Sequence, residues 1–109
     1  MRLRHSLVAA VGALTLTLAV PTSAHAAAGE FEYQWGPLGL PNLLIDPPSG
    51  ECIDLPLVTD ADPGFAPYNR TSSTATVFLD FGCSGDTYYV MDPGKRLGPR
   101  LKLRSVVFS

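Results

Sequence analysis

Asp54, Asp60 and Asp62 are the side chains in this sequence whose spacing could support catalysis or metal binding. Two carboxylates can hold a hard cation, or can act as acid and base on a glycosidic bond. A polar loop that turns at Asp62–Gly64 accounts for the same run, and no tight run of further oxygen ligands follows it. We therefore predict no metal site, no cofactor and no catalytic residue, and we keep a small carboxylate-dependent hydrolase only as a third hypothesis.

Cys52 and Cys83 are the two cysteines of the chain, and thiols can act as nucleophiles, redox groups or disulfide partners. Both histidines, His5 and His25, lie in a leader that we expect to be removed, so the rest of the chain lacks the commonest general base. In an exported domain, an even pair of cysteines predicts a disulfide. Closing a loop of about 30 residues stabilises a fold by roughly 3–4 kcal/mol.

Residues 1–26 have the layout of a signal peptide. Two arginines precede an apolar run at residues 7–20, which is shorter than the roughly 20 residues that a membrane span needs. A small-x-small tripeptide ends at Ala26, where we predict cleavage, with Ala28 as the alternative position and an uncleaved anchor as the alternative interpretation. We expect a secreted, extracellular protein with a single β domain at residues 27–109 and no membrane contact after cleavage.

Charge is unevenly distributed along residues 27–109, which hold six bases and ten acids for a net charge of −4. An acidic chain argues against binding to nucleic acid. The segment after Asp92 holds five bases and no acidic side chain, and could bind an anionic wall polymer or an acidic patch of an extracellular protein. The alternative is that Lys102 and Arg104 point outward from one strand and pair with acids on a neighbour. The predicted binding strip comprises Lys95, Arg96, Arg100, Lys102 and Arg104.

The elements that must position these residues are short strands. Nine prolines fall between Pro37 and Pro99 and leave little room for helices. Turn-forming runs such as "GPLGLPN" and "DADPGFAP" separate segments that are β-branched, aromatic or alternating. This pattern predicts an all-β, Greek-key sandwich or small barrel of five to six short strands with one disulfide. The expected strands are Phe31–Trp35, Glu51–Leu57, Ser73–Phe81, Thr87–Met91 and Leu101–Phe108.

The run "CSGD" forms the turn of a predicted hairpin, so a Cys52–Cys83 disulfide would tie this hairpin to an earlier strand. Gly82 and Gly85 allow the backbone angles that such a turn requires. Tyr88 and Tyr89 must point to opposite faces of the returning strand. We expect one tyrosine to join the core and the other to meet solvent or a partner, and the sequence does not assign them.

Phe78, Cys83, Gly85 and Tyr88 follow a spacing that resembles the folded hairpin of βγ-crystallin-type Greek-key motifs. In that family an aromatic residue is followed five residues later by a second aromatic, and then by a glycine. The resemblance implies that Ser105 corresponds to the serine that begins the closing strand. The layout is also similar to small secreted actinobacterial proteins of unknown role.

The resemblance covers Thr74–Phe108 and departs from the family at two places. Cys83 replaces the second aromatic. The calcium site of the family would place Arg100, Leu101 and Arg104 at ligand positions, where cationic and apolar side chains cannot serve. We therefore do not extend calcium binding to this chain.

A second candidate contact is the loop formed by Asp46, Pro47, Pro48 and Ser49, which leads into Cys52. Two prolines fix φ and lower the entropy that is lost on binding. Protease-inhibitor loops are commonly held in this stiff form, although an ordinary strand connection can have the same composition. This loop supports the alternative function of a proteinaceous inhibitor of an extracellular protease.

Phe31, Tyr33 and Trp35 share one face of a predicted strand. We expect this face to belong to the core, and an exposed platform that stacks on sugars is the alternative.

Taken together, the sequence favours a non-enzymatic secreted binding module whose partner is an unknown extracellular protein or an anionic wall polymer. The expected contact surface is the binding strip with the proline-rich loops.

Overall fold

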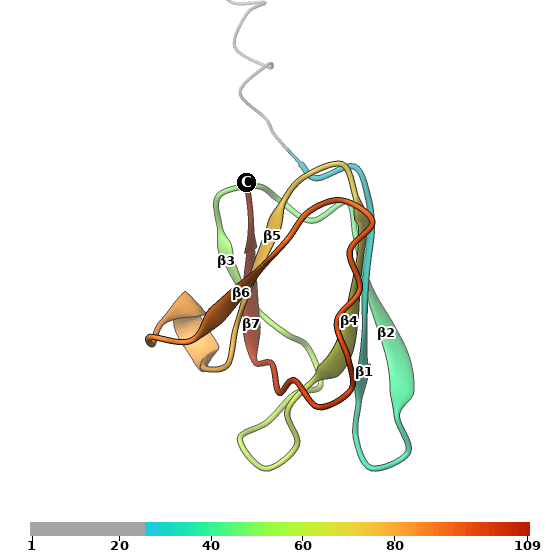
Figure 1. The fold of residues 1–109 in the computed structure, drawn as a ribbon, viewed down its shortest axis with the longest axis vertical. Coiled ribbons are helices and arrows are strands. Elements are labelled where there is room, and N and C mark those ends of the chain that lie inside the picture. The colour runs from blue at the N-terminus through green and yellow to red at the C-terminus, as the bar shows by residue number, and fades with distance from the viewer. Residues whose placement is uncertain (1–25) are drawn as a thin grey trace, which may run out of the picture.

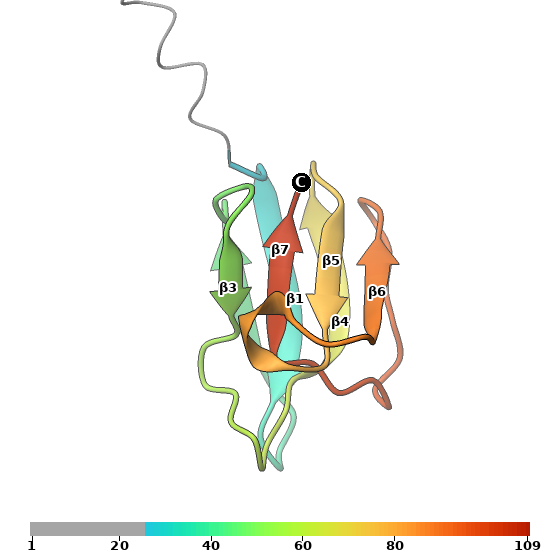
Figure 2. The same cartoon turned by 90° about the vertical axis from the view of Figure 1, so that its left-hand side faces the viewer.

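The computed structural model describes residues 26–109, and residues 1–25, which carry most of the predicted signal peptide, lie outside the described residues. Two antiparallel sheets pack face to face (Figure 1, Figure 2). The first sheet has the order β2-β1-β4 and the second has the order β3-β7-β5-β6. The strands are β1 Gly29–Trp35, β2 Leu40–Ile45, β3 Cys52–Asp54, β4 Phe65–Thr71, β5 Ala75–Phe78, β6 Tyr88–Met91 and β7 Ser105–Phe108.

The predicted all-β sandwich is confirmed, with seven strands in the described residues where five or six were expected. The two strands that were not predicted, β2 and β4, each contain a proline. Pro41 lies in β2, an edge strand of the first sheet. Pro67 lies in β4, close to an irregular register between Glu32 and Gln34 of β1. Edges and bulges are the places where sheets accept proline, so these segments form strands although their composition resembles turns.

The core lies between the sheets and is built from residues that alternate along the strands. Phe31 and Tyr33 of β1 are fully buried, and Phe31 packs edge-on against Phe108 of β7 with ring centroids 5.5 Å apart. Trp35 is partly buried and packs against the same cluster. The aromatic face of β1 therefore belongs to the core, as we expected, and is not an exposed platform for sugars.

A disulfide joins Cys52 of β3 to Cys83 of the β5–β6 hairpin, with a Cα–Cα distance of 5.8 Å. This is the predicted pairing, and it ties the hairpin to an earlier strand. The hairpin folds over through a short 3₁₀ turn at Phe81–Cys83. Gly82 and Gly85 have φ angles of 73° and 93°, the left-handed region that glycine enters without steric cost.

Ser105 fixes the same hairpin to β7. The Ser105 hydroxyl accepts a hydrogen bond from the Cys83 amide at 2.9 Å and donates one to the Asp80 carbonyl at 2.5 Å. This buried serine begins the closing strand, which is the position that the crystallin resemblance gives to a serine. Kinship with that family stays a prediction.

β6 and β7 belong to the same sheet, but β7 lies beside β5 and not beside β6, and the chain passes the edge of the other sheet between them. Such a return beside an earlier strand is the connection that Greek-key topologies use. Residues 92–104 make this connection and are called the crossing segment below. The segment leaves β6, runs along β4 and returns to β7 (Figure 1).

The positions of Tyr88 and Tyr89 differ from our expectation that one of them joins the core. Tyr88 is 54% exposed and Tyr89 is 39% exposed. Tyr89 is on the inward face, because its cross-strand partner Val77 is buried, yet it remains accessible at the edge of the sheet. The expectation was wrong because alternation identifies the face of a strand and not how much of that face is covered.

Candidate functional site

Backbone hydrogen bonds hold the crossing segment against β4. The Gly94 amide donates to the Asn69 carbonyl at 2.6 Å, and the Asn69 amide donates to the Lys95 carbonyl at 2.9 Å. The Leu97 amide donates to the Pro67 carbonyl at 3.0 Å. The first half of the crossing segment therefore extends the first sheet along the outer side of β4.

The side chain of Asn69 secures this junction from inside. It is fully buried, and its Nδ2 donates to the carbonyls of Met91 at 2.9 Å and Ser73 at 2.8 Å. Its Oδ1 accepts from the Thr71 amide at 3.1 Å and from the Thr71 hydroxyl at 2.7 Å. Asn69 thus joins β4, the end of β6 and the start of the crossing segment in one network.

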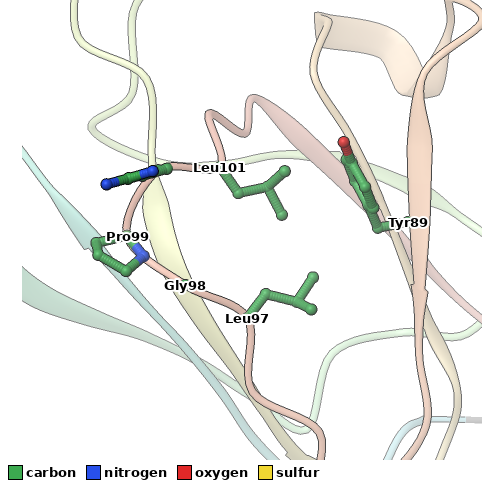
Figure 3. A pocket seen from close by; sticks show the side chains of 6 residues that line it. Tyr89, Leu97, Gly98, Pro99 and Leu101 are labelled. Carbon is green, nitrogen blue, oxygen red and sulfur yellow. The ribbon is translucent and has the colours of Figure 1, made fainter.

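An apolar pocket of about 270 Å³ lies between the crossing segment and β6 (Figure 3). The side chains of Leu97 and Leu101 point toward the ring of Tyr89 on the opposite wall. One of the lining residues is charged and the others have apolar or aromatic surfaces. The lining consists of Tyr89, Leu97, Gly98, Pro99, Arg100 and Leu101.

A tight turn brings the two leucines to the same side of the pocket. The Leu101 amide donates to the Gly98 carbonyl at 3.4 Å, and Pro99 occupies the position that proline favours in such turns. Leu97 and Leu101 also pack against the core cluster, so their positions are fixed by the fold. A preformed apolar pocket beside one guanidinium suits a ligand in which an apolar group lies next to an anionic group.

The outer face of β6 is also exposed. Tyr88 packs against Phe78 with ring centroids 5.7 Å apart, and Val90 is 55% exposed. Together with Tyr89, three large hydrophobic residues in succession are accessible on this edge strand. Single exposed hydrophobic residues are ordinary, whereas a contiguous group beside a pocket marks a candidate contact surface.

Two of the five cations in the predicted binding strip are held by neighbouring groups. The Arg104 guanidinium donates to the carbonyls of Leu79 at 2.8 Å and Asp60 at 2.7 Å. Its Nε lies 3.6 Å from the Asp60 carboxylate. Arg104 therefore pairs with an acidic residue, as the alternative to the binding strip expected. Arg96 stacks on the ring of Tyr68, with its guanidinium 3.9 Å from the ring centroid.

The other three cations of the strip are exposed but occupy different places. Arg100 lines the apolar pocket. Lys102 lines a neighbouring hollow together with Asp62 and Phe65. Lys95 follows the turn after β6, where its carbonyl is bonded to β4. The structure therefore assigns Arg100 to the pocket and places the other four cations outside its lining.

The predicted rigid loop is attached to the sandwich on both sides. The Asp46 amide donates to the Gly29 carbonyl at 2.8 Å, and the Pro47 carbonyl accepts from the Ala27 amide at 2.8 Å. Pro47 is buried, and Ser49 forms a bridge with Phe108 of β7. The loop is rigid, as its prolines indicate, but much of its backbone is already hydrogen-bonded within the fold.

Two of the three acidic side chains that could have formed a reactive group, those of Asp54 and Asp60, have structural partners. The Asp54 carboxylate accepts a hydrogen bond from the Gly82 amide at 2.8 Å, and Asp60 faces Arg104. Asp62 closes a turn through its amide, which donates to the Thr59 hydroxyl at 3.0 Å. Within residues 26–109, no three His, Cys, Asp or Glu side chains gather as metal ligands would.

Comparison of the chain with protein-family models, with curated proteins and with solved structures finds no match. Over the residues that the structure describes, no helix has the length and apolar character needed to cross a membrane.

Sequence reasoning identified Arg100 as a candidate but did not identify the pocket that it lines. Tyr89 was a possible contact residue, whereas Leu97 and Leu101 were not predicted to be contact residues. Their spacing around a Gly-Pro turn is a signal for two side chains on one side of a loop. The second wall could not be inferred, because it depends on the path of the crossing segment past β6.

Proposed function

We propose that this chain is a secreted, non-enzymatic binding module that captures an extracellular protein at the pocket between β6 and the crossing segment. The disulfide supports export, because such bonds persist in oxidising compartments. The predicted signal peptide supports the same destination. The acids that could have performed hydrolysis are engaged in turns and hydrogen bonds, which favours binding over catalysis.

The observation that carries the proposal is the pocket itself. It is open to solvent, apolar on both walls and bordered by the exposed Arg100. A large aliphatic or aromatic side chain fills such a site, and a neighbouring carboxylate would pair with the guanidinium. Protein segments commonly combine these two groups in adjacent residues.

An anionic wall polymer fits this surface less well. A polymer of charged units is best bound by an unbroken row of free cations. Arg104 is bonded to Leu79 and Asp60, and Arg96 is stacked on Tyr68. The apolar pocket would also remain unused by such a ligand, so a protein partner explains more of the surface.

Inhibition of a protease through the loop of Asp46, Pro47, Pro48 and Ser49 remains the alternative proposal. A protease binds its inhibitor loop in extended form through backbone hydrogen bonds. Here Pro47 is buried, and its carbonyl, which would have to bond to a protease, already accepts a hydrogen bond from the Ala27 amide. The anchored loop therefore favours the pocket as the contact surface.

The burial of Ala27 supports cleavage after Ala26 in preference to Ala28. Ala27 is fully buried, and the hydrogen bond from its nitrogen to the Pro47 carbonyl would be lost if residues 27 and 28 were removed, whereas after cleavage at Ala26 this nitrogen is the terminal amino group and can still donate. A mass spectrum of the secreted protein tests this start directly.

A selection from a displayed library of random linear peptides tests the proposed binding. We expect enriched peptides to place a large apolar residue beside aspartate or glutamate. Tyr89→Ala and Arg100→Gln should each weaken the binding of these peptides by about tenfold or more, because each removes one wall or the single charge of the pocket.

Matched controls lie elsewhere on the surface. Arg70→Gln removes an arginine that pairs with Glu30 on the first sheet, and Ile45→Ala truncates an exposed hydrophobic side chain of β2 in the same sheet. Each control should weaken peptide binding less than the pocket variant with which it is matched, Arg100→Gln or Tyr89→Ala. Equal losses within each pair, or enriched peptides without acidic and apolar residues, would refute the proposed site.

A further inference from the structure

The second side of β6 is unpaired within residues 26–109, since β6 ends the strand order of its sheet. The pairing of β5 shows which backbone groups lie on that side. The Ser109 amide donates to Thr74 at 2.9 Å, and the Leu79 amide donates to Thr87 at 3.5 Å. Antiparallel ladder bonds alternate, so the even residues of β5 bond to β7 and its odd residues bond to β6.

The same alternation continues into β6. Thr87, Tyr89 and Met91 direct their backbone groups toward β5, because their partners are the odd residues of that strand. The N–H and C=O groups of Tyr88 and Val90 therefore face the open edge. These groups form a short template on which one more strand could pair.

This edge lacks the features with which other edges of the fold discourage pairing. β2 carries Pro41, and β3 has only three residues. β6 contains no proline, no charged side chain and no bulge, and three of its side chains are exposed hydrophobics. Natural sheets usually protect such an edge, so an unprotected one is a candidate docking position.

The pocket lies where an added strand would place its inward side chains. Tyr89 is on the inward face of β6, and Leu97 and Leu101 face it across the pocket. A strand next to β6 would direct alternate side chains between these residues, and its other side chains would lie beside Tyr88 and Val90. Arg100 would meet an acidic residue of the same segment.

We propose that the partner binds as an extended, acidic segment of another protein that adds an antiparallel strand to the open edge of β6. This inference rests on the proposed function and specifies how the pocket is used. Charge supports an acidic partner, because the exposed Arg100 lines the pocket and residues 95–104 hold no acidic side chain. The antiparallel direction follows the pairing of every strand in both sheets.

The probe is a synthetic peptide of sequence Glu-Thr-Leu-Thr-Leu-Thr-Glu, with leucines placed for the pocket face. In an antiparallel pair, opposed residues share a face, so the residues opposite Tyr88 and Val90 are threonines of the outer face. Their amides should point toward β6. N-methylation of the threonine amides should weaken binding by about tenfold or more, whereas N-methylation of the leucine amides should change it by less than about threefold.

Equal effects of the two methylated series would overturn strand addition and leave the proposed pocket intact, because side chains could still enter it. A greater loss from the methylated leucines would also overturn it. Failure of the unmodified peptide to lose affinity in Tyr89→Ala and Arg100→Gln would instead reject the proposed function. The two failures are therefore distinguishable.

A variant of the protein tests the same edge from the other side. Val90→Pro removes an amide that faces the open edge and does not bond to β5, so the sheet should be retained. It should abolish peptide binding, and Val90→Thr should preserve it. Unchanged binding by a folded Val90→Pro protein would overturn the proposal, as would self-association of the free protein through β6 in sedimentation experiments.

Discussion

Individual side chains in this fold often serve two elements at once, and Tyr33 is the clearest case. Its ring is buried in the core, while its hydroxyl donates to the Pro56 carbonyl at 2.6 Å and accepts from Asn42 Nδ2 at 2.8 Å. Burial raises the pKa of Tyr33, and the Asn42 hydrogen bond partly opposes that shift. The neutral phenol is thus a structural group that links β1 to β2 and to the loop after β3.

The raised pKa of Tyr33 predicts a loss of stability at alkaline pH. As pH rises through about 10, the unfolded chain releases this proton before the folded chain does, so the free energy of unfolding falls. The stabilisation is complete below about pH 10 and declines above it. Urea unfolding across this range should show a shallower decline for Tyr33→Phe, although that variant loses about 1–2 kcal/mol at neutral pH. An identical decline in both proteins would contradict the prediction.

At the scale of elements, the position of the crossing segment depends on one buried corner. Asn69 bonds through its backbone to Gly94 and Lys95 and through its side chain to Met91 and Ser73. The pocket wall formed by Leu97 and Leu101 begins only a few residues later in the chain. Weakening this corner should therefore affect both stability and the pocket.

Replacement of Asn69 by alanine should lower the free energy of unfolding by about 3 kcal/mol, because each buried partner left without a hydrogen bond costs about 1–3 kcal/mol. Amide hydrogen exchange at Leu97 should also accelerate. Asn42→Ala is the matched control, since that half-buried asparagine makes one side-chain bond, to Tyr33. A smaller loss for Asn69→Ala than for Asn42→Ala would show that the corner is not important.

At the scale of the whole molecule, the two sheets share a small core, and the disulfide adds a covalent link within the second sheet, between β3 and the β5–β6 hairpin. Cys52 and Cys83 are separated by 31 residues, and their bond attaches the β5–β6 hairpin to β3. The amides of Gly82 and Cys83 in the same hairpin donate hydrogen bonds to the side chains of Asp54 and Ser105. The link should therefore act mainly by restricting the unfolded chain, since the folded hairpin has other attachments.

Replacement of both cysteines by alanine should lower the free energy of unfolding by about 3–4 kcal/mol while the sheets are retained. Chemical denaturation monitored by the fluorescence of Trp35 measures this change, and mild reduction of the unaltered protein should reproduce it. A loss of less than about 1 kcal/mol would indicate that packing alone stabilises the domain.

The sandwich and the disulfide could be predicted because alternation, turn residues and a single cysteine pair are local features of the sequence. β2 and β4 were missed because Pro41 and Pro67 lie at an edge and beside a bulge, which only the assembled sheet reveals. The basic segment was visible as charge. Which cations remain available depends on Asp60 and Tyr68, which lie far from Arg104 and Arg96 in sequence.

The central claim is that β6 and its pocket bind an extended partner segment. Hydrogen exchange of individual amides, measured with and without the Glu-Thr-Leu-Thr-Leu-Thr-Glu peptide, tests it most directly. The account predicts that bound peptide slows exchange at Tyr88 and Val90 and leaves Ser49, in the proline-rich loop, unchanged. Slower exchange at Ser49 with no change at Tyr88 and Val90 would contradict it.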